Sequence, residues 1–238
     1  MQIVLSLSLL ARMMDPSLNV AQRNNACFEL RGSTDSEVIA TMRRALSDPS
    51  VRACAGTNLR KAGAIAELKD ALADPDFQTR ALAARELGGF EKPELLPLLA
   101  AAARDPQLLV AINAVEGMAD YSDAVVLPYL LDLAKDGGLV GAAALDRALH
   151  FKDPRVLQTA RALLDSKDVS DKLAAMRVIG AMGDHTDIPK LREIQEKETG
   201  LVSSAGRGFG LIPAISLSRA AQTTIDKIGE RLPERAAR

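Results

Sequence analysis

The sequence predicts an all-α fold, a right-handed α-solenoid of about six or seven helix pairs. Two observations lead to this prediction. An Asp-led turn recurs at intervals of about 30 residues, and apolar residues at helical spacing lie on both sides of each turn. A helix pair of this size cannot bury its apolar side alone, so neighbouring pairs must stack and share one core. We therefore expect residues 1–238 to form a single repeat domain.

The first helix of each pair precedes the turn. Apolar residues stand six and two positions ahead of each turn aspartate, and this i, i+4 spacing forms one side of a helix. The five pairs are Leu9/Met13, Met42/Leu46, Leu68/Leu72, Leu99/Ala103 and Leu130/Ala134. Prolines at positions 97, 128 and 189 stand where the start of a helix tolerates the missing N–H.

The apolar run from Ile3 to Ala11 has the length of a secretory signal, but no basic residue precedes it and no small-x-small cleavage site follows. It is also too short to span a membrane. Because Leu9 and Met13 fit the repeat, we interpret Met1 to Met14 as the first helix of the array. A cytoplasmic protein is then expected, with a periplasmic or secreted protein as the alternative if the run is the remnant of an export signal.

The second helix of each pair follows the turn and carries two apolar residues four positions apart. Their larger members, the anchors, recur almost regularly, which a chance pattern would not do. The anchors are Leu30, Leu59, Leu87, Met118, Leu149 and Ile179. Polar or Gly-containing connectors then separate one pair from the next.

The last pair breaks the period. Residues 188–198 and 217–228 fit a first and a second helix, but a Gly-rich insertion at 199–213 separates them. Its centre is Gly206, Arg207, Gly208, Phe209 and Gly210. We interpret this loop as a cap that closes the array, as terminal repeats require. A partner-binding loop is the alternative, followed by an anion cradle of backbone N–H groups.

The motif Asp48-Pro49-Ser50-Val51-Arg52, followed by Ala55 and Leu59, resembles a HEAT repeat, most closely the short bacterial type found in phycobilisome lyases. In that family the turn aspartate and the arginine of the second helix link neighbouring repeats. The resemblance carries this structural role to Asp48 with Arg52 and to Asp74 with Arg80. Asp15 and Arg23 match with an insertion. Ala111 and Ala142 replace the arginine, so the ladder should be incomplete there.

The residues two positions before each anchor should point away from the core, because two residues turn a helix by about 200°. In HEAT arrays the second helices line the concave groove, so the resemblance implies that a partner contacts these residues there. The predicted partner-binding residues, with an amide on the same side, are Arg85, Asn113, Glu116, Arg147 and Arg177. Such a strip suits a polar, partly acidic peptide or protein. The alternative is a solvated surface whose charges pair across repeats.

Cys27 and Cys54 lie on consecutive second helices, at offsets from the anchors that allow the two thiols to face each other. Two interpretations stay open at this point. The thiols are reduced core residues in a reducing compartment, and they form a disulfide if the protein is exported.

Composition limits the function. The net charge of -1 and the absence of Trp argue against a nucleic-acid-binding surface. The two histidines are 35 residues apart with no ligand-like companions, so we expect no metal, no cofactor and no catalytic residue. Di-iron chemistry of the deoxyhypusine-hydroxylase type would need His-Glu pairs, which the sequence lacks. We expect a non-enzymatic scaffold that binds a protein or peptide. The alternative implied by the resemblance is a bilin-lyase-like accessory enzyme, or a chaperone for a chromophore protein.

Overall fold

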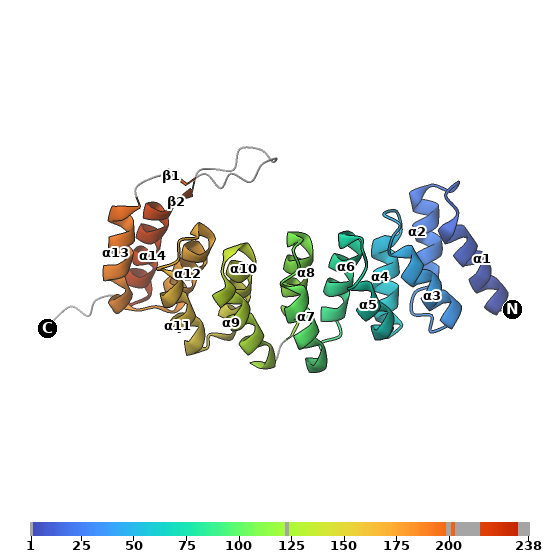
Figure 1. Cartoon of the computed structure of the whole chain (residues 1–238), viewed down its shortest axis with the longest axis horizontal. Coiled ribbons are helices and arrows are strands. Elements are labelled where there is room, and N and C mark those ends of the chain that lie inside the picture. The colour runs from blue at the N-terminus through green and yellow to red at the C-terminus, as the bar shows by residue number, and fades with distance from the viewer. Residues whose placement is uncertain (1, 122–123, 199–200, 203–214, 233–238) are drawn as a thin grey trace. The chain divides into compact units, whose positions relative to one another are not determined.

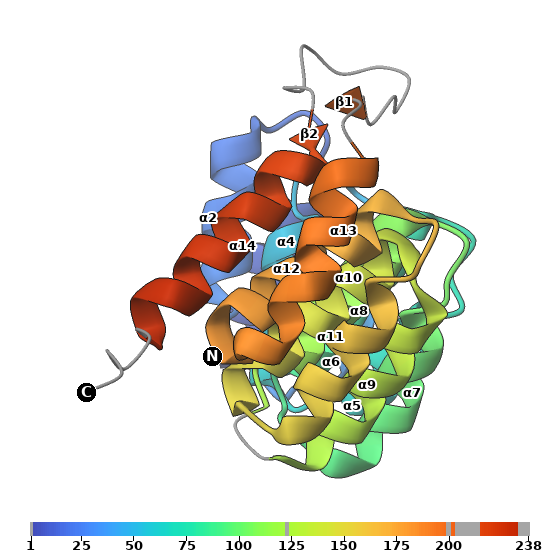
Figure 2. The ribbon, with the colours of Figure 1, turned by 90° about the vertical axis from the view of Figure 1, so that its left-hand side faces the viewer.

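The protein is an all-α repeat fold, as the sequence predicts. The computed structural model describes residues 2–121, 124–198, 201–202 and 215–232 (Figures 1 and 2). Among these residues, and within each of two compact units, the two helices of a pair pack on each other and successive second helices pack side by side. The first helices are α1 (Gln2–Met14), α3 (Ser36–Ala45), α5 (Ile65–Ala71), α7 (Leu96–Ala102), α9 (Leu127–Asp136), α11 (Pro154–Leu163) and α13 (Ile188–Lys197). The second helices are α2 (Val20–Glu29), α4 (Arg52–Lys61), α6 (Phe77–Gly88), α8 (Leu108–Met118), α10 (Gly138–Ala148), α12 (Val169–Met182) and α14 (Leu217–Arg231).

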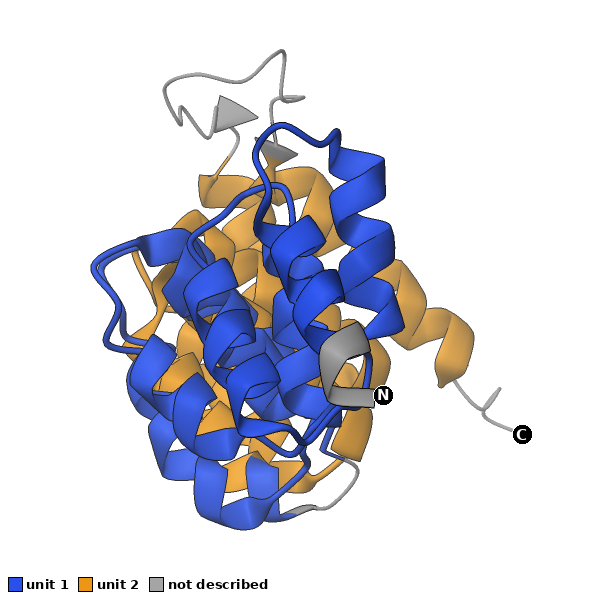
Figure 3. Ribbon diagram, turned by 90° about the vertical axis from the view of Figure 1, so that its right-hand side faces the viewer, with its two compact units in different colours: residues 1–126 blue, residues 127–238 orange. Residues whose placement is uncertain are grey.

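The chain divides into two compact units, residues 1–126 and residues 127–238 (Figure 3). Unit 1 holds α1 to α8, and unit 2 holds α9 to α14. Each unit is described by itself below, and the single domain over 1–238 stays a prediction.

Helix starts follow the turn chemistry of the sequence. The side chains of Asp35, Asp76, Asp153 and Asp168 each accept a hydrogen bond from a backbone N–H in the first turn of the helix that follows. Asn19 and Gln22 form a reciprocal capping box at the start of α2. The prolines of α7, α9 and α13 stand in the first turn of each helix. A short 3₁₀ turn precedes each of these helices: Pro93–Leu95, Ala124–Val126 and His185–Asp187.

The predicted anchors form the core, with one exception. Leu30, Leu59, Leu87, Met118 and Ile179 are at most 4% exposed. Leu149 is only half-buried, because α10 ends at Ala148 and a 3₁₀ turn, Leu149–Phe151, begins there. Leu145 and Ala148 fill the core of this pair in its place. In α1, Leu9, Leu10 and Met13 are buried against the chain, so the predicted first helix is confirmed.

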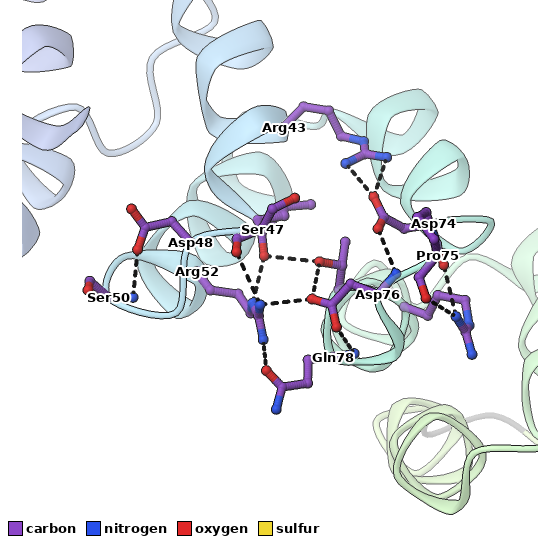
Figure 4. A network of polar contacts seen from close by, with 12 residues as sticks. Arg43, Ser47, Asp48, Ser50, Arg52, Asp74, Pro75, Asp76 and Gln78 are labelled. Carbon is purple, nitrogen blue, oxygen red and sulfur yellow. Dashed lines mark hydrogen bonds and ion pairs between the residues drawn. The ribbon is translucent and has the colours of Figure 1, made fainter. Parts of the chain in front are cut away.

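Arginines link successive helix pairs within unit 1. Arg52 donates from Nε to the carbonyl of Leu46, at the end of its own first helix, over 2.6 Å. Its Nη2 lies 2.8 Å from the carboxylate of Asp76, in the turn of the next pair (Figure 4). Arg80 repeats the pattern, with Nη1 2.8 Å from the Asp74 carbonyl and Nε 2.8 Å from the carboxylate of Asp105.

The same ladder fixes the matched aspartates. The carboxylate of Asp48 pairs with Arg23 of the preceding pair, and Asp74 accepts from Arg43 of α3 (Figure 4). Each matched arginine therefore reaches the carboxylate of the following pair and not the matched carboxylate of its own. Ala111 and Ala142 interrupt the series, as expected, and in unit 2 Lys172 stands at the same position and pairs with Glu198.

Two helices of unit 1 touch backbone to backbone. A Cβ atom at Gly88 in α6 would lie 2.2 Å from the Cα of Gly117 in α8. Neither residue can therefore carry a larger side chain without moving a helix. In unit 2, a Cβ at Gly141 would lie 3.0 Å from the carbonyl oxygen of Leu133, so Gly141 allows α10 to approach α9 closely.

Unit 2 ends in the irregular pair that the sequence predicts. Helix α14 packs on α12 and α13 (Figures 1 and 2). Two short antiparallel strands, β1 (Leu201–Val202) and β2 (Ile215–Ser216), flank the insertion, with Leu201 opposite Ser216. The candidate loop residues Gly206, Arg207, Gly208, Phe209 and Gly210 lie outside the described residues.

Candidate functional site

A polar cavity of about 350 Å³ opens on the second helices of unit 1. Its lining comes from the last turns of α4 and α6 and from the connectors that follow α6 and α8. The lining residues are Arg60, Arg85, Glu86, Gly89, Glu91 and Asp120. The repeat brings these residues together because equivalent positions of stacked pairs form a row.

Arg60 crosses from α4 to the end of α6. Its Nε donates to Glu86 over 2.7 Å, and Thr57 donates to the other carboxylate oxygen of Glu86 over 3.3 Å. The path depends on Gly89, where a Cβ atom would lie 2.8 Å from the Cδ of Arg60. Glu86 is thus held by two groups of the preceding pair, and its side chain is only 12% exposed.

Arg85 makes the equivalent crossing from α6 to α8. Its Nη1 donates to the backbone carbonyl of Glu116 over 3.0 Å, and it lies 3.7 Å from the carboxylate of Asp120. Glu116 stands in the last turn of α8, where carbonyl groups lack partners within the helix. A cation placed there also complements the negative end of the helix dipole.

Glu91 occupies the connector after α6 with a positive φ of 51°, which is uncommon for a residue with a side chain. Its side chain is exposed, and among the residues that the structure describes its carboxylate has no ion-pair or hydrogen-bond partner. The next residue, Lys92, accepts a hydrogen bond from the hydroxyl of Tyr121 through its carbonyl, over 2.8 Å. That contact joins this connector to the one after α8.

The electrostatic balance of the cavity is negative. Two arginines face three carboxylates, and the carbonyl ends of α6 and α8 add partial negative charge. Tyr121 reports the same sign of potential nearby. Burial, reinforced by the negative charges of Glu94 and Glu91, raises the pKa of Tyr121 to about 12.

The predicted partner-binding residues lie on the sides of the second helices that face away from the core, as their offset from the anchors requires. In unit 1, Arg85 is exposed, while Asn113 and Glu116 are half-buried. Asn113 donates to the carbonyl of Leu109 in its own helix. The structure brings Arg85 and Glu116 together, through the bond from the Arg85 guanidinium to the Glu116 carbonyl.

In unit 2, Arg147 and Arg177 are exposed on α10 and α12. Arg177 is paired with Asp146, its Nη2 and Nε lying 2.6 and 2.9 Å from the two carboxylate oxygens. Arg85 and Arg177 are therefore engaged with groups of this chain. An acidic partner would have to displace those contacts, which weakens the expectation of a partly acidic partner.

Cys27 and Cys54 come together in a disulfide bond. Their Cα atoms lie 6.3 Å apart, which is within the range of natural bridges. The bond joins α2 to α4, and the buried amide of Asn58 donates to the Cys27 carbonyl beside it. Of the two interpretations left open by the sequence, the bonded pair is the one seen here.

Sequence reasoning missed Arg60, Glu86, Glu91 and Asp120. Asp120 had a signal, because it stands four residues after Glu116 and so follows the same side of α8. Arg60 and Glu86 are each one residue from an anchor, an offset with no clear direction away from the core. The position of Glu91 depends on a connector conformation that no local pattern encodes.

Within the described residues, no helix is both long enough and apolar enough to cross a membrane. The same residues contain no group of three or more side chains that could hold a metal ion.

Comparison with known proteins agrees with the fold. Residues 65–146, from the start of α5 into α10, match the family model of HEAT repeats. This match covers about a third of the chain, and the described helices outside it also come in pairs of a first and a second helix. None of the curated proteins matches the sequence.

Several solved structures are similar along most of the chain. The E. coli protein YibA is 17% identical, with 95% of this chain and 81% of that chain covered and a TM-score of 0.51. The complex of CpcE and CpcF of phycocyanin lyase from Nostoc is 18% identical, with 94% of each chain covered and a TM-score of 0.42. Human deoxyhypusine hydroxylase is 17% identical, with 96% and 98% covered and a TM-score of 0.40. At these identities the likeness concerns the fold alone.

Proposed function

We propose that this chain is a protein-interaction module. It binds a polar segment of a protein partner on the sides of its second helices that face away from the core. The observation that supports the proposal most is the polar cavity of unit 1. It gathers two arginines and three carboxylates from successive pairs on one surface. HEAT repeats in general mediate protein interactions, which fits this proposal.

The contact residues that we propose are Arg85, Asn113 and Glu116 in unit 1, and Arg147 and Arg177 in unit 2. Charged and amide side chains of this kind fix the register of a partner through hydrogen bonds. A bilin-lyase-like activity stays an expectation from the sequence, because no residue described here favours it over binding.

Site-specific photo-crosslinking in the native cell tests the proposal. A photoreactive residue replaces Asn113, on α8, or Ala66, an exposed residue of the first helix α5. We expect a discrete crosslinked protein from position 113 and none from position 66. If unit 2 contacts the same partner, adding Arg147→Glu with Arg177→Glu should lower the yield of the crosslinked protein at least threefold. The thermal melt should not change, because both side chains are exposed.

Equal crosslinking from the two positions, or none from position 113, would contradict binding on the second helices.

A further inference from the structure

The cavity of unit 1 offers one carboxylate for which the described part of the chain provides no partner. Glu86 is held by Arg60 and Thr57, whereas Glu91 has no partner among the described residues. Asp120 is held less firmly than Glu86, because the 3.7 Å between its carboxylate and Arg85 is too long for a hydrogen bond. Two carboxylates of the lining can thus accept hydrogen bonds from a guest without breaking a short contact.

The cations of the cavity are less available than the carboxylates. Arg60 is bound to Glu86 over 2.7 Å, and Arg85 to the Glu116 carbonyl over 3.0 Å. An acidic guest would have to compete with these bonds. It would also meet the excess negative charge of the lining and the carbonyl ends of two helices.

The size of the cavity suits a single side chain. Ligand pockets range from roughly 300 to 1,000 Å³, and this one, at about 350 Å³, is at the lower end. A long, flexible side chain with a cationic head could cross it and place the head between Glu91 and Asp120. A guanidinium could bind a carboxylate through two parallel hydrogen bonds.

We propose that this cavity binds an arginine or lysine side chain of the protein partner, with Glu91 and Asp120 as its hydrogen-bond acceptors. The proposal rests on the function proposed above and names the chemistry of the partner at unit 1. It reverses the partly acidic partner that the sequence suggested.

Fluorescence anisotropy with short labelled peptides, blocked at both ends, tests the proposal on the full chain. One probe carries three arginines, a second three lysines and a third three glutamates, and the salt concentration is physiological. We expect the two basic peptides to bind and the glutamate peptide not to bind. The double variant Glu91→Gln with Asp120→Asn should raise the Kd of the arginine peptide at least tenfold.

A matched variant separates a local effect from the net charge. Glu67→Gln with Asp70→Asn removes two carboxylates from α5, outside the cavity, and should leave the Kd within about twofold of the unmodified chain, as expected for screened surface charges. Arg60→Gln removes a positive charge from the lining and frees Glu86, so it should tighten binding of the arginine peptide.

Three results would overturn the proposal: preferential binding of the glutamate peptide, equal weakening by the two double variants, or weaker binding after Arg60→Gln. The crosslinking experiment stands apart from these outcomes. A crosslink from position 113 without binding of basic peptides would refute only the cationic guest, and binding of basic peptides without that crosslink would refute only the proposed function.

Discussion

Arg52 shows how one side chain joins two helix pairs. Its Nε donates to the carbonyl of Leu46 and its Nη2 to the carboxylate of Asp76. The first contact satisfies a carbonyl just beyond the end of α3, and the second reaches the turn of the next pair. The planar fork of the guanidinium aims separate N–H groups at the two acceptors at a fixed spacing, which the point charge of a lysine would not fix. The arginine of the repeat motif is therefore a connector within the fold.

The disulfide between Cys27 and Cys54 makes the second residue-scale contribution. It closes a loop of 27 residues, and a loop of that length should stabilise the folded chain by about 3–4 kcal/mol through the entropy of the unfolded state. We expect dithiothreitol to lower the free energy of unfolding of the oxidised protein, measured by urea unfolding, by this amount. The double variant Cys27→Ala with Cys54→Ala should not respond to the reductant.

Thiol titration of the native, untreated protein provides the independent check. Two reactive thiols after unfolding without reductant would show that the bond is absent from the protein as isolated.

At the scale of the helices, the contact between α6 and α8 sets the tightest requirement. Gly88 and Gly117 meet where a Cβ atom would overlap the neighbouring backbone. Backbone cannot swing aside as a flexible side chain can, so the two helices would have to separate along their length. Gly229 in α14 is under no such constraint, because no heavy atom apart from its own helix backbone and its chain neighbours lies within 4 Å of its Cβ position.

The two glycines give opposite predictions for the same substitution. Gly88→Ala should destabilise the protein by about 1–3 kcal/mol because it forces α6 and α8 apart. Gly229→Ala should stabilise it by up to about 1 kcal/mol, since alanine is the better helix former and meets nothing. Urea unfolding of both variants measures the difference. A Gly88→Ala variant as stable as the unmodified chain would mean that the two helices do not touch.

The helices themselves could be predicted from the sequence far better than the cavity. Ala55 and Leu59, or Leu68 and Leu72, repeat a local spacing that any stacked helix pair must bury. Leu149 broke the pattern because the length of α10 depends on packing and not on spacing. Arg60, Glu86 and Glu91 come from three places in the chain that only the stacking of α4 on α6 unites. Their proximity depends on tertiary packing and leaves no periodic pattern in the sequence.

Across the whole molecule, aspartates at the turns make stability sensitive to acid. Hydrogen bonds from Arg80 lower the pKa of Asp105, and hydrogen bonds from Arg155 lower the pKa of Asp153 to about 2. At Asp48 burial is the largest single influence and raises the pKa. The hydrogen bonds from Arg23 and Ser50, together with the charge of Arg23, outweigh it and leave the pKa of Asp48 below its ordinary value. Both units contain such carboxylates.

The sign of the pH dependence follows from these directions. A carboxylate whose pKa is lower in the folded state binds fewer protons there than in the unfolded chain, so its contribution to stability is present above the ordinary value of 3.8 and is lost below it. We expect the urea midpoint to stay nearly constant from pH 7 to pH 5. It should then fall steadily between pH 4 and pH 2. In Arg80→Gln the fall should be smaller, because the pKa of Asp105 returns toward its ordinary value.

A midpoint that rises on acidification, or a variant that falls as steeply as the unmodified chain, would contradict this account.

The links of unit 1 have a direction, because each guanidinium reaches forward to a carboxylate of a different repeat. The acceptors differ in position, because Arg52 reaches Asp76, two residues after the turn residue Asp74, whereas Arg80 reaches the turn residue Asp105 itself. If the segment between Arg52 and Asp105 were shortened by one complete repeat, Gln107 would replace Asp76 as the residue two positions after the turn. Removing a repeat would therefore leave Arg52 facing an amide in place of a carboxylate, and the junction would need a new acceptor before the shortened array could close on itself in the same way.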